Sequence, residues 1–154
     1  MKTKLIILAL FVSMCSSQAQ EKDEMKIVSL STTHTEIIQS LGAQSTLVGV
    51  DAFSEVDFPV EVIDAYTITA EELVSLNADI VIIAFDFNGI VDGLEAEEIN
   101  YILLPPAKNL DDVYSQITTI GDIVDKKNEA SSKIRDMKLE INRILRNSDA
   151  ISSK

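Results

Sequence analysis

Histidine, cysteine and glycine are scarce in this sequence of 154 residues, which holds one, one and five of them. The five glycines are scattered and nowhere form the spaced loop of a phosphate- or dinucleotide-binding motif. No Gly-x-Ser-x-Gly elbow is present, and His34 has no cysteine near it in the sequence. A Ser/His/Asp set could be drawn from Ser31, His34 and either Asp51 or Asp86, but common residue types without a motif are weak grounds for catalysis. The sequence therefore favours a protein that is not an enzyme.

Basic residues are also few, with 13 Lys and Arg against 25 Asp and Glu and a net charge of −12. A chain this acidic repels nucleic acid and anionic membranes, which argues against both as partners, while a basic protein surface remains compatible. Closely spaced pairs of metal-ligating residues are missing, so we expect no metal site and no cofactor. For His34 two interpretations stay open, ligand contact and a local hydrogen bond at a helix start.

The N-terminus has the pattern of a signal peptide over residues 1–19. Two lysines precede an apolar run, Leu5 to Val12, that is too short to span a bilayer, and Ala19 closes a stretch of small residues. We predict cleavage after Ala19 and a periplasmic or secreted protein. Lipidation at Cys15 is the disfavoured alternative, because Met14 stands where such sites have a small residue. Cleavage would remove the only cysteine.

Apolar runs typical of buried strands alternate with segments of helical periodicity after residue 25. Strands are expected at 26–30, 46–50, 80–84 and 101–104. Helices are expected at 33–41, 70–76, 90–98, 109–121 and 126–146, with a long loop at 51–67. This alternation predicts an α/β fold, with a single parallel-sheet lobe and flanking helices over 20–125. A long C-terminal backbone helix with a frayed tail at 147–154 completes the predicted chain.

Helix boundaries are marked by capping patterns and by one apolar stripe. Thr33 with Glu36 and Thr69 with Glu72 have the spacing of capping boxes, and Asn109 with Asp112 forms a simpler cap. The final helix carries one apolar stripe, made of Ala130, Ile134, Met137, Ile141 and Leu145.

Polar and aromatic residues directly follow three of the predicted strands. The corners 31–34, 51–54 and 85–88 should meet at one edge of a parallel sheet, where ligands bind in open α/β folds. Phe53, Phe85 and Phe87 would place flat apolar surface beside hydroxyl groups, which suits a large, planar, partly apolar ligand. The alternative, that these phenylalanines pack loops onto the core, stays open.

The run SLSTTHTEIIQSLGAQSTLVGVD, residues 29–51, resembles the opening of the helical-backbone (TroA-like) periplasmic binding proteins that deliver cobalamin and ferric siderophores to bacterial ABC importers. The resemblance continues through TAEELVSLNADIVI to Arg146. Members of that family have two α/β lobes joined by one long helix. The resemblance implies that this chain corresponds to the first lobe and the helix, with the second lobe absent, so that it is truncated or pairs as a homodimer through the C-terminal helix.

The resemblance also implies a function and its residues. The chain would capture a corrinoid (cobalamin) or a ferric siderophore or haem-type ligand non-covalently at the lobe cleft, and would dock on an ABC permease through Glu71. The implied ligand contacts are Ser31, Thr32, Thr33, His34, Phe53, Ser54, Phe85 and Asp86. Relatives often have tyrosine where Phe53 stands, which leaves the ligand open. The alternatives are a stand-alone acidic protein-interaction module with a vestigial pocket and, third, a small flavodoxin-like enzyme.

Overall fold

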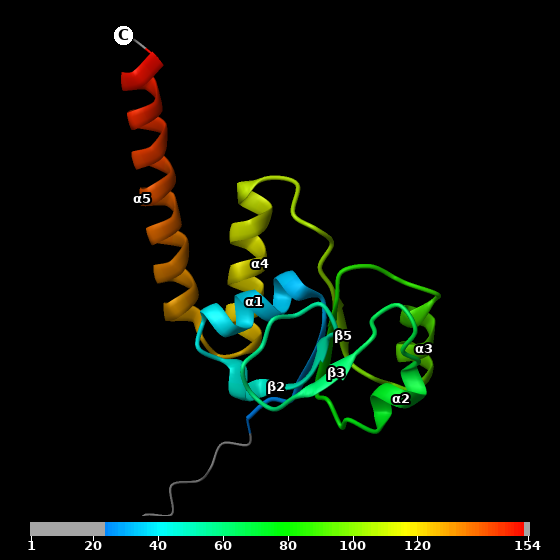
Figure 1. Cartoon of the computed structure of the whole chain (residues 1–154). Coiled ribbons are helices and arrows are strands. Elements are labelled where there is room, and N and C mark those ends of the chain that lie inside the picture. The colour runs from blue at the N-terminus through cyan, green and yellow to red at the C-terminus, as the bar shows by residue number, and fades with distance from the viewer. Residues whose placement is uncertain (1–23, 153–154) are drawn as a thin grey trace, which may run out of the picture.

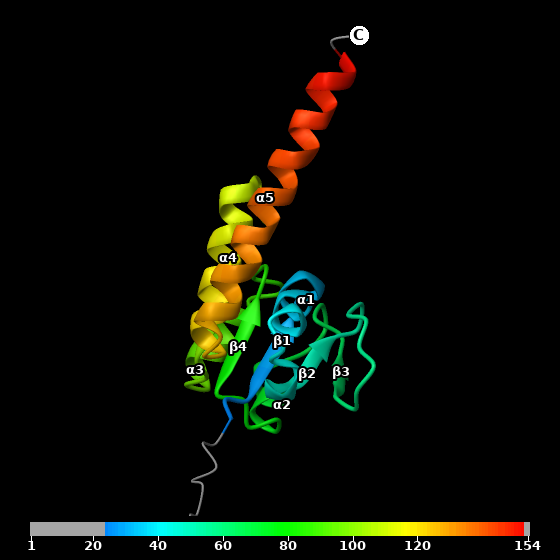
Figure 2. The ribbon, with the colours of Figure 1, turned by 90° about the vertical axis from the view of Figure 1, so that its left-hand side faces the viewer.

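The computed structural model describes residues 24–152 and shows one α/β lobe from which a long helix projects (Figures 1 and 2). The predicted signal peptide, its cleavage site and Cys15 lie outside the described residues. Within residues 24–152, no helix combines the length and the apolar character that a membrane span requires. The predicted fold class, a parallel-sheet lobe with flanking helices and a long C-terminal helix, is confirmed.

The sheet has five parallel strands in the order β3-β2-β1-β4-β5. The strands are β1 (Ile27–Leu30), β2 (Leu47–Asp51), β3 (Glu61–Ile63), β4 (Ile80–Ile83) and β5 (Tyr101–Leu103). The prediction of an unbroken loop at 51–67 is wrong, because β3 lies inside it. The strand has only three residues, which are too few for a strand pattern to stand out in the sequence, and two of them are exposed at the sheet edge.

Helices cover both faces of the sheet (Figure 2). They are α1 (Thr32–Ser40), α2 (Ala70–Val74), α3 (Ile90–Ala96), α4 (Leu110–Ile123) and α5 (Lys127–Ser152), with a short 3₁₀ turn, η1 (Gln44–Thr46). Side chains of α1, α4 and the base of α5 form one buried cluster with Ile27 and Ile82. Side chains of α2 and α3 form a second cluster with Val28, Val81 and Ile83. Neighbouring strand residues thus face opposite clusters, as a sheet buried on both faces requires.

The start of α1 differs from the prediction. Ser31 takes the N-cap position with φ −158° and ψ 125°, and no side chain caps the helix, so the predicted Thr33–Glu36 capping box is wrong. The cause is that β1 ends at Leu30 and the helix begins after a single residue, which puts Thr33 inside the first turn. The other two caps are confirmed. The Glu72 N–H donates to the Thr69 hydroxyl at 3.3 Å, the Thr69 N–H donates to the Glu72 carboxylate at 2.9 Å, and Asn109 caps α4.

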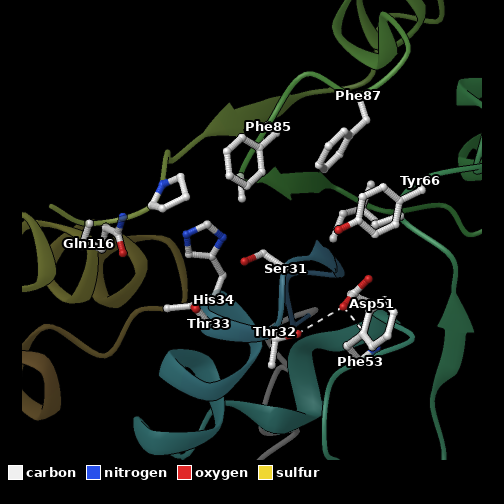
Figure 3. Close-up of a pocket in the computed structure, with 15 residues that line it drawn as sticks. Ser31, Thr32, Thr33, His34, Asp51, Phe53, Tyr66, Phe85, Phe87 and Gln116 are labelled. Carbon is white, nitrogen blue, oxygen red and sulfur yellow. Dashed lines mark hydrogen bonds between the residues drawn. The ribbon is translucent and has the colours of Figure 1, made fainter.

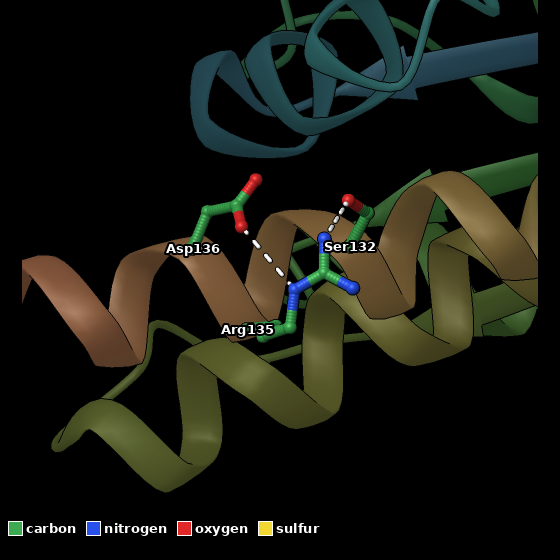
Figure 4. A network of polar contacts seen from close by, with 3 residues as sticks. All are labelled: Ser132, Arg135 and Asp136. Atoms are coloured by element: carbon green, nitrogen blue, oxygen red, sulfur yellow. Dashed lines mark hydrogen bonds and ion pairs between the residues drawn. The ribbon is translucent and has the colours of Figure 1, made fainter.

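Helix α5 continues past Arg146 to Ser152, so the prediction of a frayed tail is wrong for residues 147–152. These residues include neither glycine nor proline, so nothing in the sequence ends the helix there. At its base, Ala130 is buried and Ile134 and Met137 pack on the core cluster of α1 and α4. Polar contacts lie on its surface (Figure 4): Arg135 donates to the Ser132 hydroxyl at 2.9 Å and pairs with Asp136 at 3.4 Å.

Candidate ligand-binding site

A cavity of about 510 Å³ opens at the carboxyl edge of the sheet, where the chain leaves β1, β2 and β4 (Figure 3). Its lining combines the three predicted corners with residues after β3 and β5 and one residue of α4. The lining residues are Leu30, Ser31, Thr32, Thr33, His34, Asp51, Phe53, Ala65, Tyr66, Ala84, Phe85, Phe87, Pro106, Ala107 and Gln116. The prediction that the three strand ends meet at one edge is confirmed.

One wall of the cavity is aromatic. Phe87 contacts Phe85 and Tyr66, with ring centroids 5.3 Å and 4.6 Å apart and the rings tilted by 48° and 46°. Phe85 and Tyr66 are 49% and 53% exposed, and Phe53 across the cavity is 71% exposed. Side chains this open do not serve the core, so core packing is ruled out for Phe53 and Phe85. The exposed rings leave apolar surface that a flat ligand could cover.

The opposite wall is the start of α1, and buried hydroxyl groups hold it in place. Thr35 donates to the Ser29 hydroxyl at 2.9 Å, and Ser29 donates to the Ser31 carbonyl at 3.1 Å. Because Ser29 and Thr35 are fully buried, this chain of hydrogen bonds fixes the backbone of the corner. The N–H groups of Thr32, Thr33 and His34 have no side-chain cap and no hydrogen-bond partner among residues 24–152, so they can donate at the cavity.

His34 points into the cavity, toward the space that Ser31, Phe85 and Gln116 also face (Figure 3). The side chain is 1% exposed, and its Nδ1 has no hydrogen-bond partner among the described residues. Burial lowers the pKa of His34 from 6.5 to about 4, because a charged imidazole would lose its hydration. The ring is therefore neutral at neutral pH, and the predicted alternative of a local hydrogen bond at the helix start does not occur.

Asp51 forms part of the cavity floor. The carboxylate is 5% exposed, and its Oδ2 accepts the Thr32 hydroxyl at 3.2 Å and the Phe53 N–H at 3.1 Å. These bonds join the ends of β1 and β2, so Asp51 holds two of the three predicted corners together. Its other oxygen lies on the Tyr66 side of the cavity in Figure 3.

Not all predicted site residues line the cavity. Ser31, Thr32, Thr33, His34, Phe53 and Phe85 do. Ser54 lies outside the lining, with its Oγ buried and unpartnered, and the Asp86 carboxylate accepts the Val91 N–H of α3 at 3.1 Å. Glu71 lies exposed in the first turn of α2, also away from the lining.

Sequence reasoning missed several lining residues. Tyr66 follows β3, the strand that was not predicted, so no strand end pointed to it. Gln116 comes from the buried face of α4 and donates to the Pro105 carbonyl at 2.6 Å. No sequence signal distinguished it from a core-facing helix residue.

The arrangement suits non-covalent binding. His34 makes no hydrogen bond to a serine or an aspartate, so the Ser/His/Asp set considered from the sequence does not form a triad in the described part of the chain. Residues 24–152 also bring together no group of three or more His, Cys, Asp or Glu side chains that could hold a metal ion. Aromatic rings facing hydroxyl and N–H groups provide surface and hydrogen bonds, the two components of a small-molecule pocket.

Solved structures of similar fold include proteins whose names refer to iron or haem. A periplasmic solute-binding protein of Staphylococcus epidermidis, named as a possible iron-binding protein, is 23% identical, with a TM-score of 0.70 over 82% of this chain and 52% of that one. The haem-binding protein HutB of Vibrio cholerae is 25% identical, with a TM-score of 0.68 over 77% and 48%. A protein of the Fe³⁺-hydroxamate transport system of Saccharomonospora viridis is 21% identical, with a TM-score of 0.60 over 78% and 49%.

This chain thus spans about half the length of the solved structures that it resembles. No curated protein matches it by sequence. A sequence profile described as periplasmic binding protein matches residues 27–149, which is most of the chain and includes every element from β1 to most of α5. The chain belongs to the periplasmic binding protein family, a family of substrate-binding proteins and not of enzymes.

Proposed function

We propose that this chain is a lobe of a solute-binding protein that serves an ABC importer and captures a ferric siderophore, haem-type or corrinoid ligand. The observation that carries the proposal is the cavity at the sheet edge, in which exposed rings of Phe85 and Tyr66 face the uncapped start of α1. A planar or compact apolar chelate would cover the rings, and its oxygen atoms would accept from hydroxyl and N–H groups. The names of the haem and Fe³⁺-hydroxamate relatives support this ligand class.

A second surface should cover the side of the ligand that faces away from this lobe, since the lobe encloses the ligand on one side only. We propose that it comes from a second lobe or from a second copy of the chain, held by α5. Ile141, Ile144 and Leu145 continue the apolar stripe of α5 beyond the part that packs on α4, and the last two are exposed. These side chains offer the contact surface.

We propose Glu71 as the contact to the permease. Glu71 and Glu72 both lie in the first turn of α2, where the helix dipole alone would favour an acidic residue. Glu72 completes the capping box, whereas Glu71 is exposed and forms no hydrogen bond or ion pair with any described residue. Its carboxylate is therefore free to pair with an arginine of another protein.

Export is the remaining part of the proposal. We expect signal peptidase to cleave after Ala19 and the mature chain to reach the periplasm without a lipid on Cys15. The intact mass of the chain recovered from the periplasm tests this: a mass that begins at Gln20 supports it, and a chain that begins at a lipidated Cys15 contradicts it.

Equilibrium dialysis of the mature chain against haemin, cyanocobalamin and ferric hydroxamates, with absorbance readout, tests the proposed capture. We expect one class to bind, and Phe85→Ala to weaken it by about tenfold through lost ring contact. Val74→Ala, an exposed substitution on α2 away from the cavity, is the matched control and should bind as the unmodified chain does. If none of the three ligand classes binds, the proposal is overturned.

A further inference from the structure

The ligand cavity has no basic side chain in its lining, although it has a buried acidic one. Of the fifteen residues that form it, Asp51 carries a charge, and neither lysine nor arginine is present among them. His34 adds no positive charge at neutral pH, since burial keeps its imidazole uncharged. Anionic ligands are commonly held by arginine or lysine, and this lobe provides neither in the cavity.

Asp51 is held so that part of its carboxylate stays available. Both hydrogen bonds from Thr32 and Phe53 go to Oδ2, and Oδ1 accepts none from the described residues. Figure 3 shows this second oxygen on the side of Tyr66, so it can accept a hydrogen bond from a ligand donor. The fold thus places a fixed negative charge at the floor of the cavity.

The start of α1 adds positive charge to the cavity, but less than the negative charge that Asp51 adds. A helix N-terminus carries about half of a positive charge, and its free N–H groups attract oxygen atoms. The Thr32 hydroxyl in this first turn already donates to Asp51, so the full negative charge of the carboxylate lies beside the partial positive charge of the helix. The balance of charge is negative, while the N–H groups can still bind neutral oxygen acceptors.

Charged groups around the mouth do not reverse this balance. Lys108 follows the lining residue Ala107 but lines a separate pocket together with Asp112. Asp64 and Asp86 lie within two residues of Tyr66 and Phe85 in the chain, and each carboxylate accepts a backbone N–H group. None of these charged residues therefore adds a basic side chain to the lining of the cavity.

From this distribution we infer that the ligand surface seated in this lobe is uncharged or cationic, and that Asp51 sets the preference. The inference rests on the proposed function and narrows its ligand class. It favours ferric hydroxamates, whose complexes are neutral or positively charged, over ferric carboxylates and catecholates and over the propionate side of haem.

Three ligands that share one iron-binding core and differ in charge test the inference: ferrioxamine B, which is cationic, its N-acetyl derivative, which is neutral, and its N-succinyl derivative, which is anionic. We expect affinity for the mature chain to fall about fivefold or more with each step toward negative charge, and less at high salt. Asp51→Asn keeps an oxygen for Thr32 and Phe53 and should bring the three affinities within about twofold. Asp57→Asn, an exposed carboxylate without a partner among the described residues, should leave the order unchanged.

The outcomes separate the two proposals. If the succinyl derivative or haemin binds as tightly as ferrioxamine B, or if Asp51→Asn preserves the order, the charge preference is overturned and solute capture stands. If haemin, cyanocobalamin and all three hydroxamates fail to bind, solute capture itself is overturned, and the charge preference with it.

Discussion

His34 faces the cavity with an unpartnered Nδ1, and its pKa is lowered by burial to about 4. In the unfolded chain the pKa returns to about 6.5, so between these pH values the unfolded chain binds a proton that the folded chain does not. The free energy of unfolding must therefore fall as pH is lowered through this window. We predict that His34 accounts for a loss of about 2.5 kcal/mol between pH 7 and pH 4.5.

Urea unfolding of the mature chain and of His34→Gln at the two pH values measures this loss. The glutamine amide does not titrate, so the variant should lose about 2.5 kcal/mol less than the unmodified chain over the same interval. Equal losses in the two proteins would show that folding does not lower the pKa of the His34 imidazole. A titration of the imidazole followed by NMR gives an independent value of the pKa.

At the scale of single residues, the site could be predicted where chain direction decides it. Ser31 to His34, Phe53 and Phe85 follow recognisable strands, and strand ends of a parallel sheet share one edge. Asp86 was predicted as a ligand contact from the same rule, but its carboxylate accepts a backbone N–H at the start of α3. The position of a residue after a strand predicts that it lies at the carboxyl edge of the sheet. The direction of its side chain depends on local hydrogen bonds that the sequence does not reveal.

Helix α2 offers a test of two adjacent glutamates with different roles. Glu72 accepts the Thr69 N–H and belongs to the capping box, while Glu71 has no partner among the described residues. We predict that Glu72→Ala lowers the free energy of unfolding by about 1 kcal/mol and that Glu71→Ala changes it by less than half as much. Urea unfolding measures both variants.

The same pair separates stability from docking. We expect Glu71→Ala to weaken binding to the permease while Glu72→Ala leaves the docking surface in place. Loss of permease binding in Glu72→Ala alone would contradict the assignment of Glu71.

Elements were predictable where the sequence repeats a local signal. The caps at Thr69 and Asn109 were confirmed because a hydroxyl or amide at N-cap, followed by a carboxylate three residues later, has one strong local solution. The Thr33–Glu36 pattern has the same spacing, but the end of β1 at Leu30 starts the helix earlier. Strand β3 pairs with the edge of β2, a tertiary contact, and its three residues are too few to predict a strand on their own even though two of them are β-branched.

The whole molecule raises the question of what covers the upper part of α5. Ile141, Ile144 and Leu145 share a helix face with Ile134 and Met137, whereas the exposed Leu139 lies on the opposite face. If copies pair through this face, Leu145→Glu should shift the chain to monomer in sedimentation equilibrium, and Leu139→Glu should not. These few side chains bury less surface area than a stable interface needs. We therefore expect weak, concentration-dependent pairing. A monomer at every concentration would contradict pairing.

The parallel sheet and its flanking helices were expected from the alternation of strands and helices, and this level of the fold was predicted correctly. The length of α5 was underestimated, because polarity beyond Arg146 indicated fraying although residues 147–152 include neither glycine nor proline. Polarity reports solvent exposure, and a helix that projects from its domain is exposed without being unwound.

That projection has a consequence for amide hydrogen exchange. Helix α5 has 26 residues and α4 has 14, so at 1.5 Å per residue they are about 39 Å and 21 Å long. Only the lower part of α5 lies against α4, where Ala130, Ile134 and Met137 pack (Figures 1 and 2). Opening of the lower turns must break that packing, whereas the upper turns can open alone. Deuterium should therefore enter α5 from its far end, and a partner bound there would be seen first as a slowing of that uptake.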